Sequence, residues 1–182
     1  MKKHLFSYLW FLILLLGACQ TDVPQEHLET VQAPLTTMML VRHAEKVEDG
    51  SKNPSLTEKG ARRAETIRQL FEEAGINALY ATPFERTEKT LQPLAATLGM
   101  TVENYDPSLG AEQLIDEMLA KHAGEKIFIA GHSNTIPAML NVLTGSDDYE
   151  DFTHDQYDDL FVVSLAEKGK AAVTRLQVKV AD

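Results

Sequence analysis

The sequence has one cysteine and no surplus of positive charge. A single cysteine excludes a disulfide framework and any cysteine-rich metal site. The 17 Lys and Arg stand against 27 Asp and Glu, a net charge of −10, whereas nucleic-acid binders carry a basic surplus. The composition is near the globular average, with 44% hydrophobic residues, and excludes a disordered or polytopic membrane protein. Its 182 residues suffice for one domain with a buried core.

An almost unbroken apolar run lies near the amino terminus, and it is too short to span a bilayer. Two lysines precede the run, which covers residues 5–16, and Gly17 and Ala18 follow it. A spanning helix needs about 20 apolar residues. A basic start, a short apolar stretch and small residues are typical of an export signal. An uncleaved membrane anchor is the alternative interpretation of this segment.

The only cysteine directly follows that run. Leu16-Gly17-Ala18-Cys19 resembles the lipobox of bacterial lipoproteins, in which the signal is cut before the cysteine and the thiol is acylated. This resemblance implies a signal peptide over 1–18 and lipidation of Cys19. The segment 19–35 contains Pro24 and Pro34 and has no clear periodicity, which predicts a flexible tether. Several acyl chains, palmitate among them, would give a stable membrane anchor outside the cytoplasm. Gln20 in the next position favours the outer membrane of a Gram-negative envelope, and a stray buried cysteine is the alternative.

The remaining residues, 36–182, alternate strand and helix patterns and are expected to form one domain. Short apolar runs over 38–41, 78–81 and 127–130 are typical of strands buried on both faces. This alternation predicts an α/β fold, a three-layer α/β/α sandwich with a mainly parallel central sheet. Further strands are expected near residues 101–104, 161–163 and 173–178.

Helices are expected between these strands. The first opens with Ser55-Leu56-Thr57-Glu58, which has the pattern of a capping box, and the second with Thr82-Pro83 as its cap and first turn. Pro93 is expected to kink or split the second helix. Residues 146–159 are predicted to form a solvated acidic loop, since they lack the spacing of a calcium-binding loop. The inner face of the first helix is predicted to carry Ala61, Ala64, Ile67, Leu70, Phe71 and Ala74.

Three of the buried strands end in side chains that suit a phosphate group. The first ends in Arg42-His43, the second leads through Thr82 to Arg86, and the third ends in Gly131-His132. Because the carboxyl ends of the strands border the binding crevice of an open α/β sheet, we expect these residues to lie together. Guanidinium groups bind phosphate oxygens in a planar, bidentate manner, and imidazoles act as nucleophiles or acid–base groups near neutral pH.

This set resembles the active site of the histidine phosphatase superfamily, also called the phosphoglycerate-mutase-like family. The Arg-His-Gly motif of the family appears here as Arg42-His43-Ala44. The second family arginine matches Arg86, which Thr90 follows at the usual spacing, and the second histidine matches His132. The resemblance covers residues 36–178 and implies the phosphoglycerate-mutase-like fold.

The resemblance also implies a phosphoric monoester hydrolase that works through a phosphohistidine intermediate on His43. Arg42, Arg86 and His132 would hold the phosphate oxygens, and the backbone N–H of Ser133 could join them. No cofactor and no metal are implied, since cationic side chains take the part that Mg²⁺ plays elsewhere. The expected substrate is a small or envelope-linked phosphorylated compound.

No motif identifies the acid that protonates the leaving group. The family usually supplies a carboxylate after the second arginine, and Glu112 is the candidate, with Asp106 as the alternative. A phosphoramidate or another good leaving group would need no such acid. Glu45 and Lys46 either line the entrance or form an exposed ion pair.

Structural interpretations stay open for the same residues, because Arg42 could pair with Glu45, Arg86 with Glu85 or Glu88, and His132 could cap its own helix. Other functions stay open as well. These are a mutase or a phosphohistidine phosphatase of the same fold, and a non-catalytic envelope lipoprotein that binds an anion or a partner. The sequence does not determine the oligomeric state.

Overall fold

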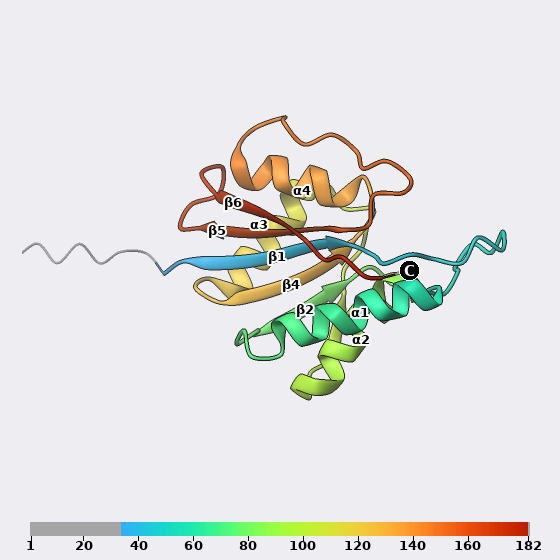
Figure 1. The fold of residues 1–182 in the computed structure, drawn as a ribbon. Helices are drawn as coiled ribbons and strands as arrows, with labels where there is room; N and C mark the ends of the chain where they lie inside the picture. Colours follow the sequence, from blue (N-terminus) through green and yellow to red (C-terminus); the bar gives the residue numbers. More distant parts are fainter. Residues whose placement is uncertain (1–33, 182) are drawn as a thin grey trace, which may run out of the picture. The chain divides into compact units, whose positions relative to one another are not determined.

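The computed structural model describes residues 34–181, which form a six-stranded sheet covered by helices on both faces (Figure 1). The predicted signal peptide, the lipidation of Cys19 and nearly all of the predicted tether lie outside the described residues. Within residues 34–181, no helix combines the length and the apolar character needed to cross a bilayer.

The sheet has the strand order β3-β2-β4-β1-β5-β6. Its first four strands in this order are parallel, whereas β5 runs antiparallel to β1, and β6 runs antiparallel to β5. The predicted α/β fold is therefore confirmed, with a mixed sheet in which parallel pairs form the centre. The strands are β1 (Thr36–Arg42), β2 (Ala78–Ala81), β3 (Val102–Asn104), β4 (Lys126–Gly131), β5 (Asp159–Leu165) and β6 (Ala172–Gln177).

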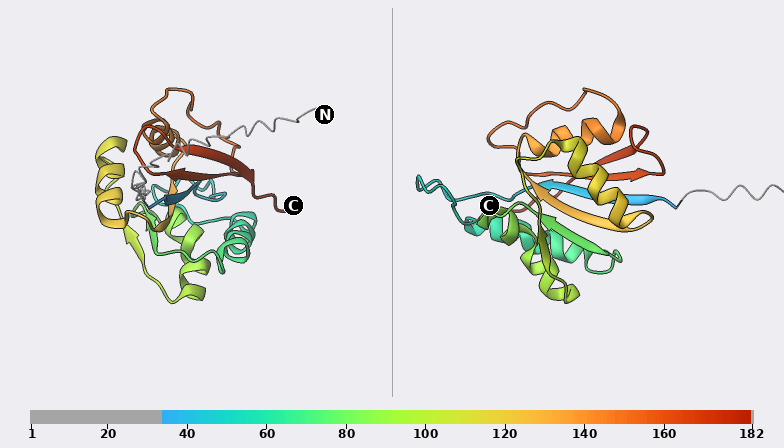
Figure 2. Two further views of the ribbon diagram at one scale, coloured as in Figure 1. Left: turned by 90° about the vertical axis from the view of Figure 1, so that its left-hand side faces the viewer. Right: turned by 180° about the vertical axis from the view of Figure 1, so that it is seen from behind.

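Two pairs of helices enclose the sheet, one pair on each face (Figures 1 and 2). One pair is α1 (Glu58–Phe71) and α2 (Glu85–Leu98), and the other is α3 (Ala111–His122) and α4 (Thr135–Thr144). Successive side chains of a strand point to opposite faces, so β1 contributes to two cores. Its Met38 and Leu40 belong to the core beneath α3 and α4, while Met39 and Val41 belong to the core beneath α1 and α2. Double burial explains why these strands appear as unbroken apolar runs.

The first helix begins two residues later than its capping pattern suggested. Thr57 is the N-cap, and its hydroxyl accepts a hydrogen bond from the Gly60 N–H at 3.0 Å. Ser55 instead accepts a hydrogen bond from the Lys89 ammonium at 2.8 Å. The buried residues are therefore Gly60, Arg63, Ala64 and Ile67, whereas Ala61 is exposed and Leu70 is 58% exposed. The predicted inner face of α1 was wrong at Ala61 and Leu70. The buried face of the helix includes the charged Arg63, and the apolar residues do not all lie on that face.

The second helix also differs from its predicted start. Its N-cap is Phe84, which makes no side-chain cap, and the Thr82 hydroxyl contacts the Thr87 hydroxyl at 2.8 Å instead. Pro93 lies inside a helix that continues to Leu98, so the helix is not split. The Thr82 side chain is thus free of a capping role, and its hydroxyl reaches the site described below.

Candidate active site

Strand pairing brings the first and third predicted segments together at the carboxyl ends of β1 and β4. Arg42 pairs with Gly131, and the His43 N–H donates to the Gly131 carbonyl at 2.9 Å. The next residue on each strand is a histidine, and the His43 and His132 ring centroids lie 5.5 Å apart. The structure therefore places the two imidazoles side by side, as the strand-end argument predicts.

The first turn of α2 is tied to the same place by Thr90. The Thr90 hydroxyl accepts a hydrogen bond from the Ala44 N–H at 2.9 Å and donates to the Arg86 carbonyl at 2.7 Å. This hydroxyl joins the turn after His43 to the helix that carries Arg86. All three strand-end segments are thus connected within a few residues of the imidazoles.

His43 is held as a neutral imidazole with a defined tautomer. Its Nδ1 lies 2.8 Å from the Ala44 carbonyl oxygen, which can only accept, so Nδ1 carries the hydrogen and Nε2 carries the lone pair. The side chain is buried, with the whole residue 3% exposed. Burial, with the charges of Arg42 and Arg86, lowers the pKa of His43 to about 3. A neutral ring with a free Nε2 lone pair is the form required of a nitrogen nucleophile.

His132 is also neutral, and a ladder of hydroxyl groups orients it. Its Nε2 lies 2.9 Å from the Thr82 hydroxyl, which lies 2.8 Å from the Thr87 hydroxyl. Thr87 contacts two backbone carbonyls, at Thr82 and Phe84, so its single hydrogen points to them. Thr82 then donates to Thr87 and accepts from His132 Nε2–H, which leaves the lone pair on Nδ1. Burial first, and then the Arg86 and Arg42 charges, lower the pKa of His132 to about 4.

The two arginines supply the positive charge of the site. Burial lowers the pKa of Arg42, and burial together with the Arg42 charge lowers the pKa of Arg86. Within the described residues, both guanidinium Nε–H groups are buried and have no hydrogen-bond partner. Unpaired buried donors and repulsion between like charges are both relieved by an anion bound between the groups. The arrangement is therefore suited to a phosphate.

Each guanidinium rests on an aromatic ring, and sequence patterns pointed to neither ring. The Arg42 guanidinium carbon lies 4.1 Å from the Tyr157 ring centroid, and that of Arg86 lies 4.4 Å from the Phe84 ring centroid. The Tyr157 ring centroid is also 6.0 Å from that of His43. A ring beneath each planar group fixes its orientation and stabilises its charge. Phe84 lies between Thr82-Pro83 and Arg86, and Tyr157 lies in a polar stretch. No pattern of apolar residues therefore marks either ring as part of a site.

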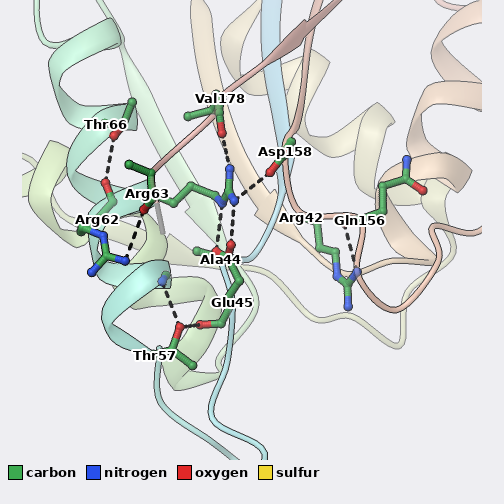
Figure 3. Close-up of polar contacts among 12 residues, drawn as sticks. Arg42, Ala44, Glu45, Thr57, Arg62, Arg63, Thr66, Gln156, Asp158 and Val178 are labelled. Atoms are coloured by element: carbon green, nitrogen blue, oxygen red, sulfur yellow. Dashed lines mark hydrogen bonds and ion pairs between the residues drawn. The ribbon is translucent and has the colours of Figure 1, made fainter.

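The stretch predicted as a solvated acidic loop contributes directly to the site. Arg42 Nη1 donates to the backbone carbonyls of Thr153, His154 and Gln156 at 2.8, 3.1 and 3.1 Å, and Figure 3 shows the contact with Gln156. Most acidic residues of this loop are exposed, as predicted. Its contacts with Arg42 are made by backbone carbonyls, which carry no sequence signal. We call residues 153–158 the Arg42 clamp.

The structure does not bring Glu112 to the four central residues. Its carboxylate is 3.1 Å from the Lys168 ammonium, and its side chain is 74% exposed. Lys168 follows β5 at the amino end of β1, since Leu165 pairs with Thr36, whereas Arg42 ends β1. The alternative acid, Asp106, accepts a hydrogen bond from the Ser108 N–H at 2.8 Å. Neither carboxylate has a described contact with the imidazoles or guanidiniums.

The other predicted contacts have different outcomes. Glu45 and Lys46 do not pair, because Glu45 binds Arg63 and Lys46 binds Glu48 at 2.7 Å. Ser133 lies in the turn after His132, and its carbonyl accepts a hydrogen bond from the Phe152 N–H at 2.9 Å. That bond anchors the start of the Arg42 clamp next to the turn in which a phosphate-binding N–H was predicted.

Two structural alternatives are also decided by these contacts. Arg42 does not pair with Glu45, and Glu85 forms its ion pair with Lys89, at 2.5 Å. Among residues 34–181, no three His, Cys, Asp or Glu side chains gather as a group that could hold a metal ion. No carboxylate forms a hydrogen bond or ion pair with the four central residues in that part of the chain. The site is a cup of two guanidiniums and two neutral imidazoles.

A family model described as "Histidine phosphatase superfamily (branch 1)" matches residues 38–109, which include Arg42, His43 and Arg86. A search of curated proteins found no match to the chain.

Solved structures with the same fold include several phosphatases. A putative phosphohistidine phosphatase SixA from Nakamurella multipartitia is 20% identical, with a TM-score of 0.61, and the match covers 80% of this chain and 95% of that one. The protein histidine phosphatase SixA complexed with tungstate is 15% identical, with a TM-score of 0.64 and 78% and 97% of the two chains covered. A mutant phosphoserine phosphatase from Entamoeba histolytica in complex with phosphoserine is 15% identical, with a TM-score of 0.60 and 76% and 95% covered.

At these identities the solved structures establish a common fold, and the family model adds the sequence signature of the first two motifs. His132, which lies beyond the matched residues, joins those motifs through the geometry given above. The resemblance that the strand-end residues indicated is thereby confirmed: residues 38–109 match the model of the histidine phosphatase superfamily, and the chain shares its fold with solved phosphatases.

Proposed function

We propose that this protein is a phosphatase that hydrolyses a phosphomonoester through a phosphohistidine intermediate on His43, without a metal. The observation that carries the proposal is the neutral His43 imidazole, with its Nε2 lone pair, beside two buried guanidiniums. The solved structures that share the fold include phosphatases, one with tungstate and one with phosphoserine.

In the first step, His43 Nε2 attacks phosphorus, the N–P bond forms and the bond from phosphorus to the substrate oxygen breaks in line. Arg42 and Arg86 hold the equatorial oxygens and stabilise the charge that spreads over them. In the second step, water attacks phosphorus and the N–P bond breaks. Phosphate is released and the neutral His43 imidazole is restored. His132 has its lone pair on Nδ1 and takes up a proton there when the phosphate dianion binds. Its Nδ1–H then donates a hydrogen bond to a phosphate oxygen.

The leaving group is the weak point of this chemistry, because no carboxylate contacts the cup in the described residues. A poor alkoxide leaving group requires a proton from an acid, whereas an aryl oxide or an imidazole leaves more readily. We therefore propose that the substrate is a phosphomonoester with a good leaving group. The phosphohistidine of a protein or peptide is the second candidate substrate. The solved SixA structures, named as histidine phosphatases, favour this candidate.

The test is hydrolysis of p-nitrophenyl phosphate by the full chain, followed by trapping of a ³²P-labelled, acid-labile enzyme intermediate. Wild-type protein should release phosphate in the presence of a chelator and should form the labelled intermediate, whereas His43→Ala should do neither. Full activity of His43→Ala would exclude the nucleophile assignment. Phosphate binding with no hydrolysis by the wild type would favour a non-catalytic anion-binding lipoprotein.

A comparison of substrates tests the leaving-group argument. Phosphoserine, p-nitrophenyl phosphate and a phosphohistidine peptide differ in leaving-group basicity but share the transferred group. We expect the rate to be lowest for phosphoserine, and an equal rate for all three would show that an acid is supplied. Transfer of the phosphoryl group to a second substrate alcohol would instead indicate a mutase.

We also propose that the protein acts at the cell envelope, anchored by lipid at Cys19 after removal of residues 1–18. The proposal rests on the lipobox resemblance alone. Labelled palmitate should enter the wild-type protein and should not enter Cys19→Ser, and the variant should leave the membrane fraction. Labelling of the Cys19→Ser variant would contradict the anchor.

A further inference from the structure

Arg63 on α1 is buried, and the proposed reaction does not use it. The residue is 2% exposed, less than any other charged residue in the part of the chain that the structure describes. A guanidinium in such a position is costly unless its donors are paired. The contacts of Arg63 therefore indicate the role of this buried charge.

Three separate segments of the chain meet at the Arg63 guanidinium (Figure 3). Glu45 binds it in a bidentate manner, with Nε–Oε2 at 2.9 Å and Nη2–Oε1 at 2.6 Å. Asp158 Oδ1 lies 2.8 Å from Nη2, and Nη1 donates to the Val178 carbonyl. Arg63 thus joins the turn after His43, the end of the Arg42 clamp and the tail that follows β6.

The Asp158 contact matters because of its neighbours in the clamp. Tyr157 lies beneath the Arg42 guanidinium, and the Gln156 carbonyl accepts a hydrogen bond from Arg42 Nη1 at 3.1 Å. Since Asp158 directly follows these two residues, an ion pair to Asp158 limits how far the clamp can move. The carbonyls of the clamp accept the Nη1 hydrogens of Arg42, so the other N–H groups of Arg42 are left for the site.

We propose that Arg63 is a positioning residue for the phosphate site, which acts through Asp158 and the Arg42 clamp to fix the Arg42 guanidinium. This inference deepens the proposed function and rests on it. Glu45 provides the fixed end of the link, because its own carbonyl is hydrogen-bonded to the Thr57 N–H at 2.9 Å and thereby to the start of α1. Arg63 itself does not contact the phosphate.

The test measures the dissociation constant of inorganic phosphate by calorimetry on the full chain, with KM and kcat for p-nitrophenyl phosphate beside it. Arg63→Gln keeps hydrogen-bonding capacity but removes the charge. Arg62→Gln is the matched control, since Arg62 is the preceding residue on the same helix, is exposed, and within the described residues donates to the Ala181 carbonyl at 3.3 Å. We expect the phosphate dissociation constant to rise about tenfold in Arg63→Gln and to stay within about twofold in the control.

A double-mutant cycle separates positioning from general stability. In an Arg42→Lys background the clamp has no guanidinium to hold, so Arg63→Gln should then weaken phosphate binding by less than about threefold. Arg63→Lys should restore part of the affinity, because it keeps one ion pair. If Arg63→Gln does not fold, Asp158→Asn carries the test, since it leaves the buried Glu45–Arg63 pair intact and should weaken phosphate binding in the same direction.

An unchanged phosphate dissociation constant in Arg63→Gln or Asp158→Asn would overturn the inference, as would an equal loss in both Arg42 backgrounds. Phosphate binding that depends on Arg63, in a protein that hydrolyses nothing, would overturn the proposed function and leave the positioning role standing. A wild-type chain that does not bind phosphate would overturn both.

Discussion

Replacing Gly60 with alanine should place a methyl group against the turn that follows His43. A Cβ built on Gly60 lies 2.3 Å from the Glu45 carbonyl oxygen. A carbon–oxygen contact needs about 3.3 Å, so α1 and this turn must separate by about 1 Å. The Glu45 carbonyl cannot give way freely, because it accepts hydrogen bonds from the Thr57 N–H at 2.9 Å and the Thr57 hydroxyl at 3.3 Å.

The magnitude follows from these contacts. Stretching the two hydrogen bonds costs about 1 kcal/mol each, and overpacking adds about 1 kcal/mol, while alanine regains about 1 kcal/mol of helix propensity. The free energy of unfolding should therefore fall by about 2 kcal/mol. For a domain of this size, that corresponds to a melting temperature lower by about 4–8 °C. Because Glu45 also holds Arg63, kcat/KM for p-nitrophenyl phosphate should fall about tenfold.

Thermal unfolding followed by circular dichroism, with the hydrolysis assay at 25 °C, tests both numbers. Gly110→Ala is the control: Gly110 precedes α3 and a Cβ there meets nothing within 4 Å, so its melting temperature should change by less than about 2 °C. Equal melting temperatures for Gly60→Ala and the wild type would refute the close approach of α1 to the turn. A lowered melting temperature with unchanged kcat/KM would show that the close approach of α1 to the turn affects stability and not catalysis.

Three further predictions concern the charges of the site. The folded pKa values of His43 and His132, about 3 and about 4, lie below the ordinary 6.5, so the unfolded chain binds protons first and stability should fall as pH drops from 6.5 toward 3, by up to about 1.4 kcal/mol per pH unit for each histidine. Urea unfolding at several pH values should show a shallower acid decline in His43→Asn, and an equal slope would contradict the assignment. Arg86→Lys keeps the charge but loses the planar fork that rests on Phe84, so phosphate affinity should fall by about 10²-fold, measured by calorimetry against the wild type. Phosphate binding at pH 6 should take up a proton at His132, seen as a dependence of the binding enthalpy on the buffer, and a dependence that persists in His132→Asn would place the proton elsewhere.

Much of the fold could be predicted from the sequence, because the signals are local. The runs over 38–41, 78–81 and 127–130 match β1, β2 and β4 to within two residues at each end, since a strand buried on both faces must be apolar throughout. Helix starts were less predictable. Ser55 and Thr57 are both capping residues two positions apart, and only the packing of α1 against the turn after His43 selects Thr57.

The central residues of the site were predictable for a related reason. Parallel strands place their carboxyl ends at one edge, so Arg42, His43 and His132 meet wherever β1 and β4 pair. Glu112, by contrast, was chosen by its order in the chain, and no local signal places a surface carboxylate. Its ion pair with Lys168 is decided by the packing of α3 and by the β5–β6 turn.

The sequence by itself determined the strands, the layer arrangement and the four groups that gather at the carboxyl ends of the strands, because these depend on apolar runs and on the residues that follow them. Only the tertiary structure decided how those groups are held. The Arg42 clamp and the contacts of Arg63 with Asp158 and Val178 join residues more than 90 positions apart, through backbone carbonyls and through an ion pair made by a buried guanidinium. Carbonyl groups are common to every residue, and a buried charge is compatible with a sequence only when the fold supplies its partners.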